Sequence, residues 1–184
     1  MTHQGTKELA SRRLILRRLS EKDAHMMFRN WAGDPQVTRY LSWTAHENLT
    51  QTQEVLRGWE QQYNDADFYH WGIVPDLLGE PIGTISVVKI REQSAELGYC
   101  IGSDWWHQGY TTEALRTVLA FLFEQVGFQS VTLRHAVQNG HSGDVAVKCG
   151  MKCIGTEQRT DPAGDGPVDL ALYRMTAEEY RRAQ

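Results

Sequence analysis

One stretch of the chain, Ser94 to Thr112 (SAELGYCIGSDWWHQGYTT), constrains the fold more than any other. Its first part alternates the apolar residues Leu97, Tyr99 and Ile101 with smaller or polar ones, a pattern typical of a strand. The alternation ends at Gly102, where a turn begins. The stretch therefore predicts a strand that leads through a glycine turn into the next element.

That next element is predicted to be a helix over residues 111–125, because apolar residues recur there at three- and four-residue spacing. The N-terminus of a helix presents free backbone N–H groups and the positive end of the helix dipole. Gly109, just before it, allows an anion to approach the backbone closely. We therefore expect an anion site here, for a cofactor that carries phosphate and a thioester.

The rest of the chain alternates strand and helix patterns. Residues 1–11 are expected to form a flexible arm and residues 12–184 a single domain. Segment 35–48 reads as irregular and 161–167 as a Gly- and Pro-rich loop. The predicted strands are 13–19, 68–74, 82–90, 95–101, 131–137, 151–159 and 168–175, and the other helices are 20–33, 49–63, 142–149 and 176–184.

These elements predict a mixed, mostly antiparallel seven-stranded sheet with helices on both faces, an α+β or α/β fold. The helix over 111–125 joins the fourth strand to the fifth, and a crossover of that length makes the two strands parallel. We expect their C-terminal ends to splay apart and admit a ligand, a familiar place for a cofactor in open sheets.

Composition excludes several classes of function. A net charge of −4 gives no electrostatic footprint for nucleic acid, and no apolar run suggests a membrane span or a signal peptide. Three cysteines argue against a disulfide framework and favour a cytoplasmic setting. Cys149 and Cys153 lack a second ligand pair at metal spacing, so no metal site is expected.

Several motifs, taken in order, resemble the GNAT superfamily of acetyl-CoA-dependent N-acetyltransferases, most closely its RimJ/RimL-like branch, which acetylates the N-termini of ribosomal proteins. The resemblance implies the GNAT acyl-CoA N-acyltransferase fold, acetyl-CoA as the cofactor, and a primary amine as the acceptor, with a protein N-terminus favoured. It also leaves a homodimer open. The matching stretches are RLILRRLSEKDA, DPQVTRYLSW, PIGTISV, SAELGYCIG, WWHQGYTTEAL, NGHSGDVAVKCGM and LYRMTAEEY.

Three positions depart from the family pattern. Trp106 stands at the basic or amide position of the pyrophosphate loop, and Thr111 stands at a position that is usually small. Many members carry a tyrosine acid seven residues after the asparagine that matches Asn139, but this chain has Ala146 there. The resemblance therefore suggests Ser142 as the acid that protonates the departing thiolate.

The cofactor would be held in two ways, and a further backbone group would stabilise the reaction. Backbone N–H groups from Gln108 to Thr112 would hold the pyrophosphate, and the edge of the central strand would pair with the pantetheine amides. An N–H near Cys100 or Ile101 would stabilise the oxyanion. The expected cofactor-binding residues are Tyr99, Cys100, Ile101, His107, Gln108, Gly109, Tyr110, Thr111, Thr112, Asn139, Ser142 and Lys148.

Glu96 is the best-placed carboxylate to take a proton from the amine, directly or through water. His70 and His135 are alternative bases, although each also reads as a structural histidine. Glu96 also reads as a solvated surface residue, and Ser142 as a helix cap. Asn139 also reads as a plain turn residue. Tyr40, Trp43 and His70 are the expected acceptor-pocket residues.

Other functions stay open at this stage. The chain could be an acyl-CoA-binding regulator that has lost the chemistry, or an acetyltransferase for an amino acid, a polyamine or an aminoglycoside. A nucleotide-binding module is disfavoured, because the sequence has no GxxxxGK[ST] motif and no GxGxxG after the first strand.

Overall fold

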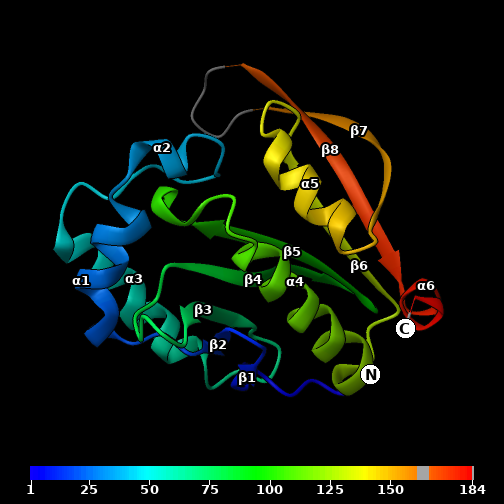
Figure 1. The fold of residues 1–184 in the computed structure, drawn as a ribbon, viewed down its shortest axis with the longest axis horizontal. Coiled ribbons are helices and arrows are strands. Elements are labelled where there is room, and N and C mark those ends of the chain that lie inside the picture. Colours follow the sequence, from blue (N-terminus) through cyan, green and yellow to red (C-terminus); the bar gives the residue numbers. More distant parts are fainter. Residues whose placement is uncertain (161–165, 184) are drawn as a thin grey trace.

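The computed structural model describes residues 1–160 and 166–183, so most of the loop predicted at 161–167 lies outside the described residues. An eight-stranded mixed sheet runs through the molecule in the order β1-β2-β3-β4-β5-β6-β8-β7 (Figure 1). The strands are β1 (Leu9–Ala10), β2 (Leu14–Arg17), β3 (His70–Pro75), β4 (Gly83–Arg91), β5 (Ser94–Ile101), β6 (Ser130–Ala136), β7 (Lys152–Thr160) and β8 (Pro167–Thr176).

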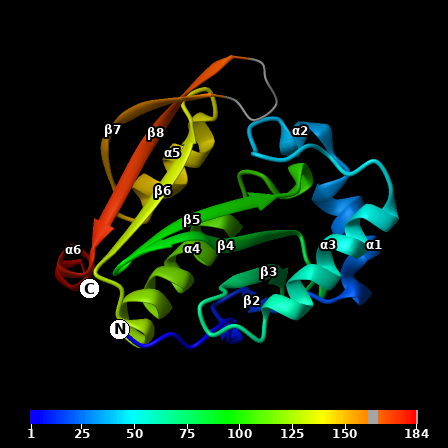
Figure 2. The same ribbon diagram turned by 180° about the vertical axis from the view of Figure 1, so that it is seen from behind.

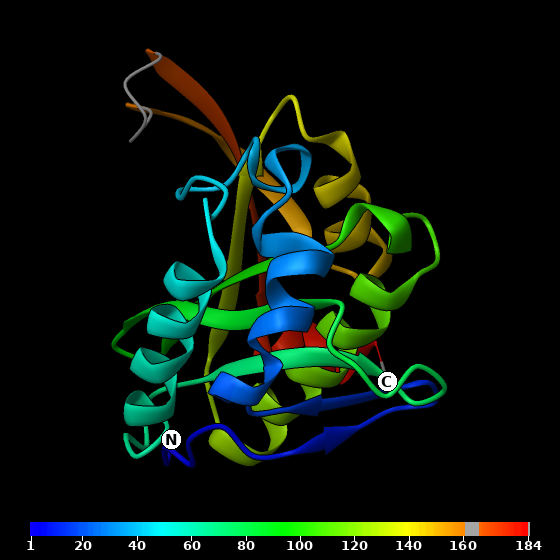
Figure 3. The same ribbon diagram turned by 90° about the vertical axis from the view of Figure 1, so that its left-hand side faces the viewer.

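Helices cover both faces of the sheet, as expected (Figures 1 and 3). One face carries α1 (Ala24–Met27), the π-helical segment Phe28–Ala32, α2 (Pro35–Thr38) and α3 (Leu49–Gln62). The other face carries α4 (Tyr110–Ala120), its π-helical continuation Phe121–Val126, α5 (Gly140–Lys148) and α6 (Ala177–Arg182). Short 3-10 turns at Glu21–Asp23 and Ser103–Trp105 complete the elements.

The N-terminal segment corrects two expectations, the seven-stranded sheet and the flexible arm. Leu9 pairs with Leu16, which adds the short strand β1 to the sheet edge. Thr6 is buried, and its hydroxyl donates to the carbonyl of Phe68 at 2.9 Å. Residues 1–11 therefore pack along the body, because their polar groups find partners there.

The parallel pair is confirmed. Strands β5 and β6 pair in parallel from Ser94↔Ser130 to Leu97↔Leu133, and the pairing stops there. Strand β5 continues to Ile101 and β6 continues beyond Leu133. The C-terminal ends of the two strands therefore separate, which opens the sheet at the position expected from the crossover.

Helix α4 is fixed against this part of the sheet by its apolar stripe. Ala114, Leu115, Val118 and Leu119 are all 1% exposed or less, and they belong to the same core as Leu97. Truncating a buried leucine of this kind typically costs about 2–5 kcal/mol. The start of α4 is therefore held firmly relative to the end of β5.

Helix α2 lies in the segment that was expected to be irregular. Asp34 caps this helix, since its side chain accepts a hydrogen bond from the N–H of Gln36 at 2.8 Å. Pro35 occupies the first helical position, which its fixed φ favours. An Asp-Pro pair is a helix-start signal, so the sequence carried the information for this one-turn helix.

Glu113 ties the N-terminal segment to the first turn of α4. Its carboxylate accepts hydrogen bonds from the Ser11 hydroxyl at 2.8 Å and from the N–H and Nε of Arg13, each at 2.7 Å. Burial raises the pKa of Glu113, but the hydrogen bonds from Arg13 and Ser11 outweigh burial and leave the pKa below its ordinary value of 4.5. The ionised form is thus the stabilising one.

We expect Glu113→Gln to lower the free energy of unfolding at pH 7 by about 2 kcal/mol, because charged hydrogen bonds are lost. A carboxyl group with a lowered folded pKa stabilises above its unfolded pKa and stops doing so as the pH falls through the folded value. The difference from wild type should therefore shrink below about pH 4. Urea unfolding across this pH range measures it, with Glu178→Gln in the exposed Glu178–Arg182 pair as a control that should show no change.

None of the described helices is both long and apolar enough to cross a bilayer.

Candidate active site

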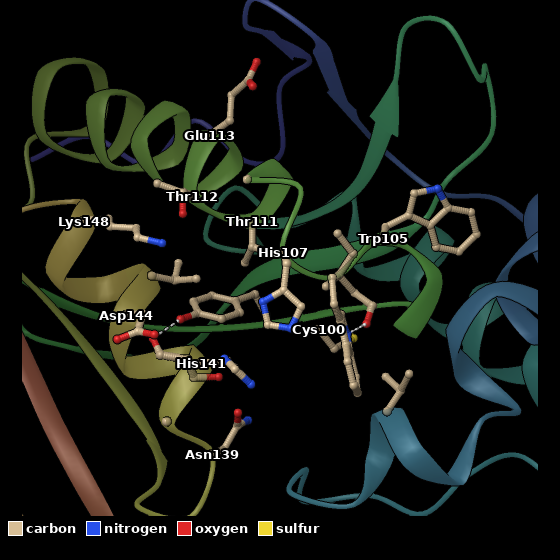
Figure 4. Close-up of a pocket in the computed structure, with 18 of the residues that line it drawn as sticks. Cys100, Trp105, His107, Thr111, Thr112, Glu113, Asn139, His141, Asp144 and Lys148 are labelled. Carbon is tan, nitrogen blue, oxygen red and sulfur yellow. Dashed lines mark hydrogen bonds between the residues drawn. The ribbon is translucent and has the colours of Figure 1, made fainter.

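A cavity of about 1070 Å³ opens where β5 and β6 separate (Figure 4). Its walls come from the C-terminal end of β5, the loop before α4, the first turns of α4 and α5, and the segment that includes α2. Of the expected site residues, the cavity brings together Tyr40, Tyr99, Cys100, Ile101, His107, Gly109, Thr111, Thr112, Asn139, Ser142 and Lys148.

The N-terminus of α4 supplies free donors at this cavity. Gly109 has φ +80°, a left-handed conformation that glycine adopts without strain, and it caps the helix. The first N–H to bond back into the helix is that of Glu113, to the carbonyl of Gly109 at 3.1 Å. The N–H groups of residues 110–112 therefore have no intrahelical acceptor, as at any helix start, and are suited to a phosphate.

The edge of β5 supplies a second set of donors. Gly102 donates its N–H to the carbonyl of Ile82 on the β4 side at 2.8 Å. Because backbone groups alternate between the two neighbouring strands, the N–H groups of Tyr99 and Ile101 point to the other side, beyond the last β5–β6 pair. The carbonyl of Ile101 accepts from the Trp106 indole at 2.9 Å. Of the two expected oxyanion donors, this alternation favours Ile101 over Cys100.

The first turn of α5 forms the opposite wall. The hydroxyl of the half-buried Tyr99 donates to the backbone carbonyl of Ser142 at 2.9 Å and so fixes α5 to β5. Burial raises the pKa of Tyr99, so its phenol stays protonated. The Asn139 side chain makes no capping bond although this residue is the N-cap, and Ser142 lies inside the helix rather than at its cap. Both side chains are thus free to face the cavity.

Sequence reasoning missed part of the positive charge at the cavity. Arg116 on α4 lines it and donates to the backbone carbonyl of Lys148 on α5 at 2.6 Å, and Lys148 lines the same cavity. Arg12 also lines the cavity. A spacing signal for Arg116 existed, since it follows Thr112 by four residues and therefore lies on the same face of α4.

Two histidines face each other at the cavity wall. The rings of His107 and His141 lie 4.5 Å apart in an edge-to-face arrangement (Figure 4). His107 has φ +60°, a conformation that is uncommon for residues other than glycine. His141 was not among the expected residues, although it belongs to the quoted NGHSGDVAVKCGM stretch.

Two expected cofactor residues turn away from the cavity. The Gln108 side chain donates to the carbonyl of Asp104 at 2.8 Å, and the Arg13 guanidinium covers the ring of Tyr110 at 4.5 Å. Neither side chain lines the cavity. Tyr110 can still contribute its backbone N–H, because it is the first residue of α4.

Two expected acceptor-pocket residues also lie elsewhere. His70 is buried on β3 beneath Trp59, with ring centroids 3.9 Å apart, and burial lowers its pKa to about 3. Trp43 packs beside His46 and against the core beneath α1 and α3. Of the three residues expected in the acceptor pocket, only Tyr40 lines the cavity.

The two remaining candidate bases lie outside the cavity lining. Glu96 is on β5, and its Oε1 lies 3.5 Å from Nε of Arg134. His135 is on β6, with Nδ1 donating to the carbonyl of Ala136 at 2.8 Å, so Nε2 is the acceptor nitrogen and is buried without a partner. Glu96 shares a face of β5 with Gly98 and Cys100, and Cys100 reaches the cavity.

Free amides at a helix N-terminus, a free strand edge beside them and nearby cations define a site for a phosphate-bearing acyl thioester. Residues 13–152 match the acetyltransferase (GNAT) domain. The chain belongs to the GNAT acetyltransferase family, and acetyl-CoA is its acyl donor. The donors around the cavity fit this molecule, because its phosphates need N–H groups and cations and its pantetheine amides need a strand edge.

Individual relatives agree with this family. The uncharacterized N-acetyltransferase YoaA of Bacillus subtilis (strain 168) is 26% identical over 169 residues, which cover 91% of this chain and 95% of the relative. A GNAT-family acetyltransferase from Bacillus anthracis shares the fold with a TM-score of 0.82 and 18% identity, over 94% of this chain and 99% of that one. RimL, a ribosomal L7/L12 α-N-protein acetyltransferase in complex with coenzyme A, has a TM-score of 0.81 and 17% identity, over 92% and 98% of the two chains.

We expect Arg116→Gln to weaken CoA binding by about tenfold, since a charged contact to phosphate is worth about 1.5–3 kcal/mol. The loss should diminish as salt is raised, because screening weakens the same attraction in wild type. Calorimetric titration with CoA measures both effects. Lys22→Gln, at an exposed site on the first 3-10 turn, is the matched control; an equal loss there would refute a local role for Arg116.

Proposed function

We propose that this enzyme transfers the acetyl group of acetyl-CoA to a primary amine, most readily the α-amino group of a protein N-terminus, by direct attack in a ternary complex. The observation that carries the proposal is the separation of β5 from β6 after Leu97↔Leu133, directly beside the free N–H groups of α4. This gap gives an extended cofactor arm a strand edge to pair with. It also leaves the other face of β5 open to an acceptor.

Each residue has one proposed role. Acetyl-CoA, when bound, would supply an activated thioester carbonyl. The N–H of Ile101 would donate to the oxygen of that carbonyl, where negative charge develops. Glu96 would accept the proton of the amine through a water, since its carboxylate lies on the same face of β5 as Cys100. Ser142 would donate a proton to the sulfur as the C–S bond breaks, and would regain a proton from solvent.

An N-terminal acceptor suits a carboxylate base of this kind. An α-amino group has a pKa of about 8, whereas a lysine side chain has a pKa of about 10.4. The pKa of the α-amino group is thus roughly two units lower, so a weaker base can deprotonate it. The named activity of RimL on a ribosomal protein N-terminus supports the same acceptor class and the RimJ/RimL-like branch.

The test is a thiol-release assay with a panel of amines. It compares a peptide with a free N-terminus, the same peptide blocked at its N-terminus but containing lysine, a free amino acid, a polyamine and an aminoglycoside. Mass spectrometry then locates the acetyl group. We expect the free N-terminus to react best. If a small amine reacted best, the acceptor would be a small molecule and not a protein N-terminus. CoA binding without turnover on any amine would favour a regulator.

We propose a cytoplasmic setting, which the three free cysteines support, and a homodimer as the assembly suggested by the branch. Light scattering of the purified chain tests the second proposal directly. A monomer at micromolar concentration would overturn it.

A further inference from the structure

A row of charged side chains crosses the open face of the sheet from β5 to β7. It consists of Glu96 on β5, Arg134 on β6 and Glu157 on β7. Figure 2 shows this face, with no helix in front of β5, β6 and β8. Arg134 stands just beyond the last β5–β6 pair, Leu97↔Leu133, so it lies where the two strands begin to separate.

Arg134 is shared unequally between the two carboxylates. Its NH1 donates to Oε1 of Glu157 at 2.5 Å, a short charge-assisted bond. Its Nε lies 3.5 Å from Oε1 of Glu96 and makes no hydrogen bond, although this nitrogen is buried. Glu157 therefore forms a hydrogen bond with the guanidinium, whereas Glu96 forms only an ion pair with it.

This difference matters for proton transfer. A cation in hydrogen-bond contact with a carboxylate favours the ionised form and occupies the lone pairs that would take a proton. A carboxylate that is ion-paired to the cation without a hydrogen bond keeps its oxygens available to a water. The arrangement thus leaves the Glu96 oxygens without a hydrogen bond from Arg134 and free to accept a proton from a water.

We propose that Glu157 is a positioning residue that keeps Arg134 out of hydrogen-bond contact with Glu96 and so keeps Glu96 competent as a base. The inference rests on the proposed role of Glu96. Two other cations face Glu96: Lys89, its pairing partner on β4, and Arg174, which pairs with Thr132 on β8. Both are exposed and neither forms a hydrogen bond with Glu96. The position of Arg134, which its bond to Glu157 sets, therefore decides how strongly a cation acts on Glu96.

The test is the pH dependence of kcat/KM in two variants that should move it in opposite directions. In Glu157→Gln, Arg134 is released and turns to Glu96, so the acid limb should move to lower pH by roughly half a unit or more, and the plateau should fall several-fold. In Arg134→Gln, the cation is removed, so the acid limb should move to higher pH. Arg134→Lys should restore much of the wild-type profile.

Arg174→Gln is the matched control, because it removes an exposed cation from the same face without touching this row. An unmoved acid limb in both variants, or a shift of both in one direction, would overturn the inference. The Glu157 side chain is 38% exposed, so Glu157→Gln should fold even if Arg134→Gln does not. Full activity of Glu96→Gln would instead show that the proposed base is wrong, a separate result.

Discussion

Glu96→Gln should lower kcat by roughly 10²–10⁴-fold, the range of a lost general base. CoA affinity should stay unchanged, because Glu96 does not line the cavity proposed for the cofactor. The amide is nearly the same size as the carboxylate, and Arg134 keeps its bond to Glu157. The variant should therefore fold normally and fail only in turnover.

Thiol release under saturating acetyl-CoA measures the turnover, and calorimetry with CoA measures the binding. Glu54→Gln on α3 provides a control for the loss of one negative charge. If Glu96→Gln turned over at the wild-type rate, the proton would have to pass to His135 or to bulk water. His70 would not be a substitute, because it is buried beneath Trp59, where an amine or a water cannot reach it.

The parts of the site that follow from the backbone were predictable from sequence. The alternation through Tyr99 and Ile101, the turn at Gly102 and the glycine before α4 fix where donors must lie. Each of these signals is local, and a crossover helix brings them together in a fixed geometry. A cavity therefore lies where the sequence predicts the cofactor, and the parallel strands separate where they were expected to.

Side-chain placement was less predictable, because it depends on partners distant in sequence. Trp43 and His70 are polar or amphipathic aromatics in plausible positions, yet Trp43 packs against the core on the α1–α3 face and His70 is buried beneath Trp59. Gln108 is turned aside by a carbonyl four residues earlier. Leu9 and Thr6 dock on the body through a short strand pairing and one buried hydroxyl, which composition alone does not reveal.

Gly102→Ala should be the most damaging small substitution near the site. A Cβ at residue 102 would lie 2.1 Å from the backbone carbonyl oxygen of Asn30 and 2.8 Å from the Trp105 ring. Asn30 cannot move easily, because it is buried and its Nδ2 donates to the carbonyl of Pro81 at 2.8 Å. The end of β5 must therefore shift, and the loop that leads to α4 must shift with it.

We expect Gly102→Ala to lower the free energy of unfolding by about 3 kcal/mol, at the upper end for overpacking. The melting temperature should drop by roughly 6–12 °C for a chain of this size. CoA affinity should fall about tenfold, since the displaced loop carries the α4 amides away from the strand edge. Thermal melts with and without CoA measure both effects.

Gly140→Ala is the matched control for this change. It also adds one methyl group to a glycine that lines the cavity, but a Cβ there meets nothing within 4 Å. Alanine is favoured over glycine in a helix, so its melting temperature should stay level or rise slightly. If both variants behaved like wild type, contact with the carbonyl of Asn30 would not fix the end of β5. The position of the loop between β5 and α4 would then depend on α4 alone.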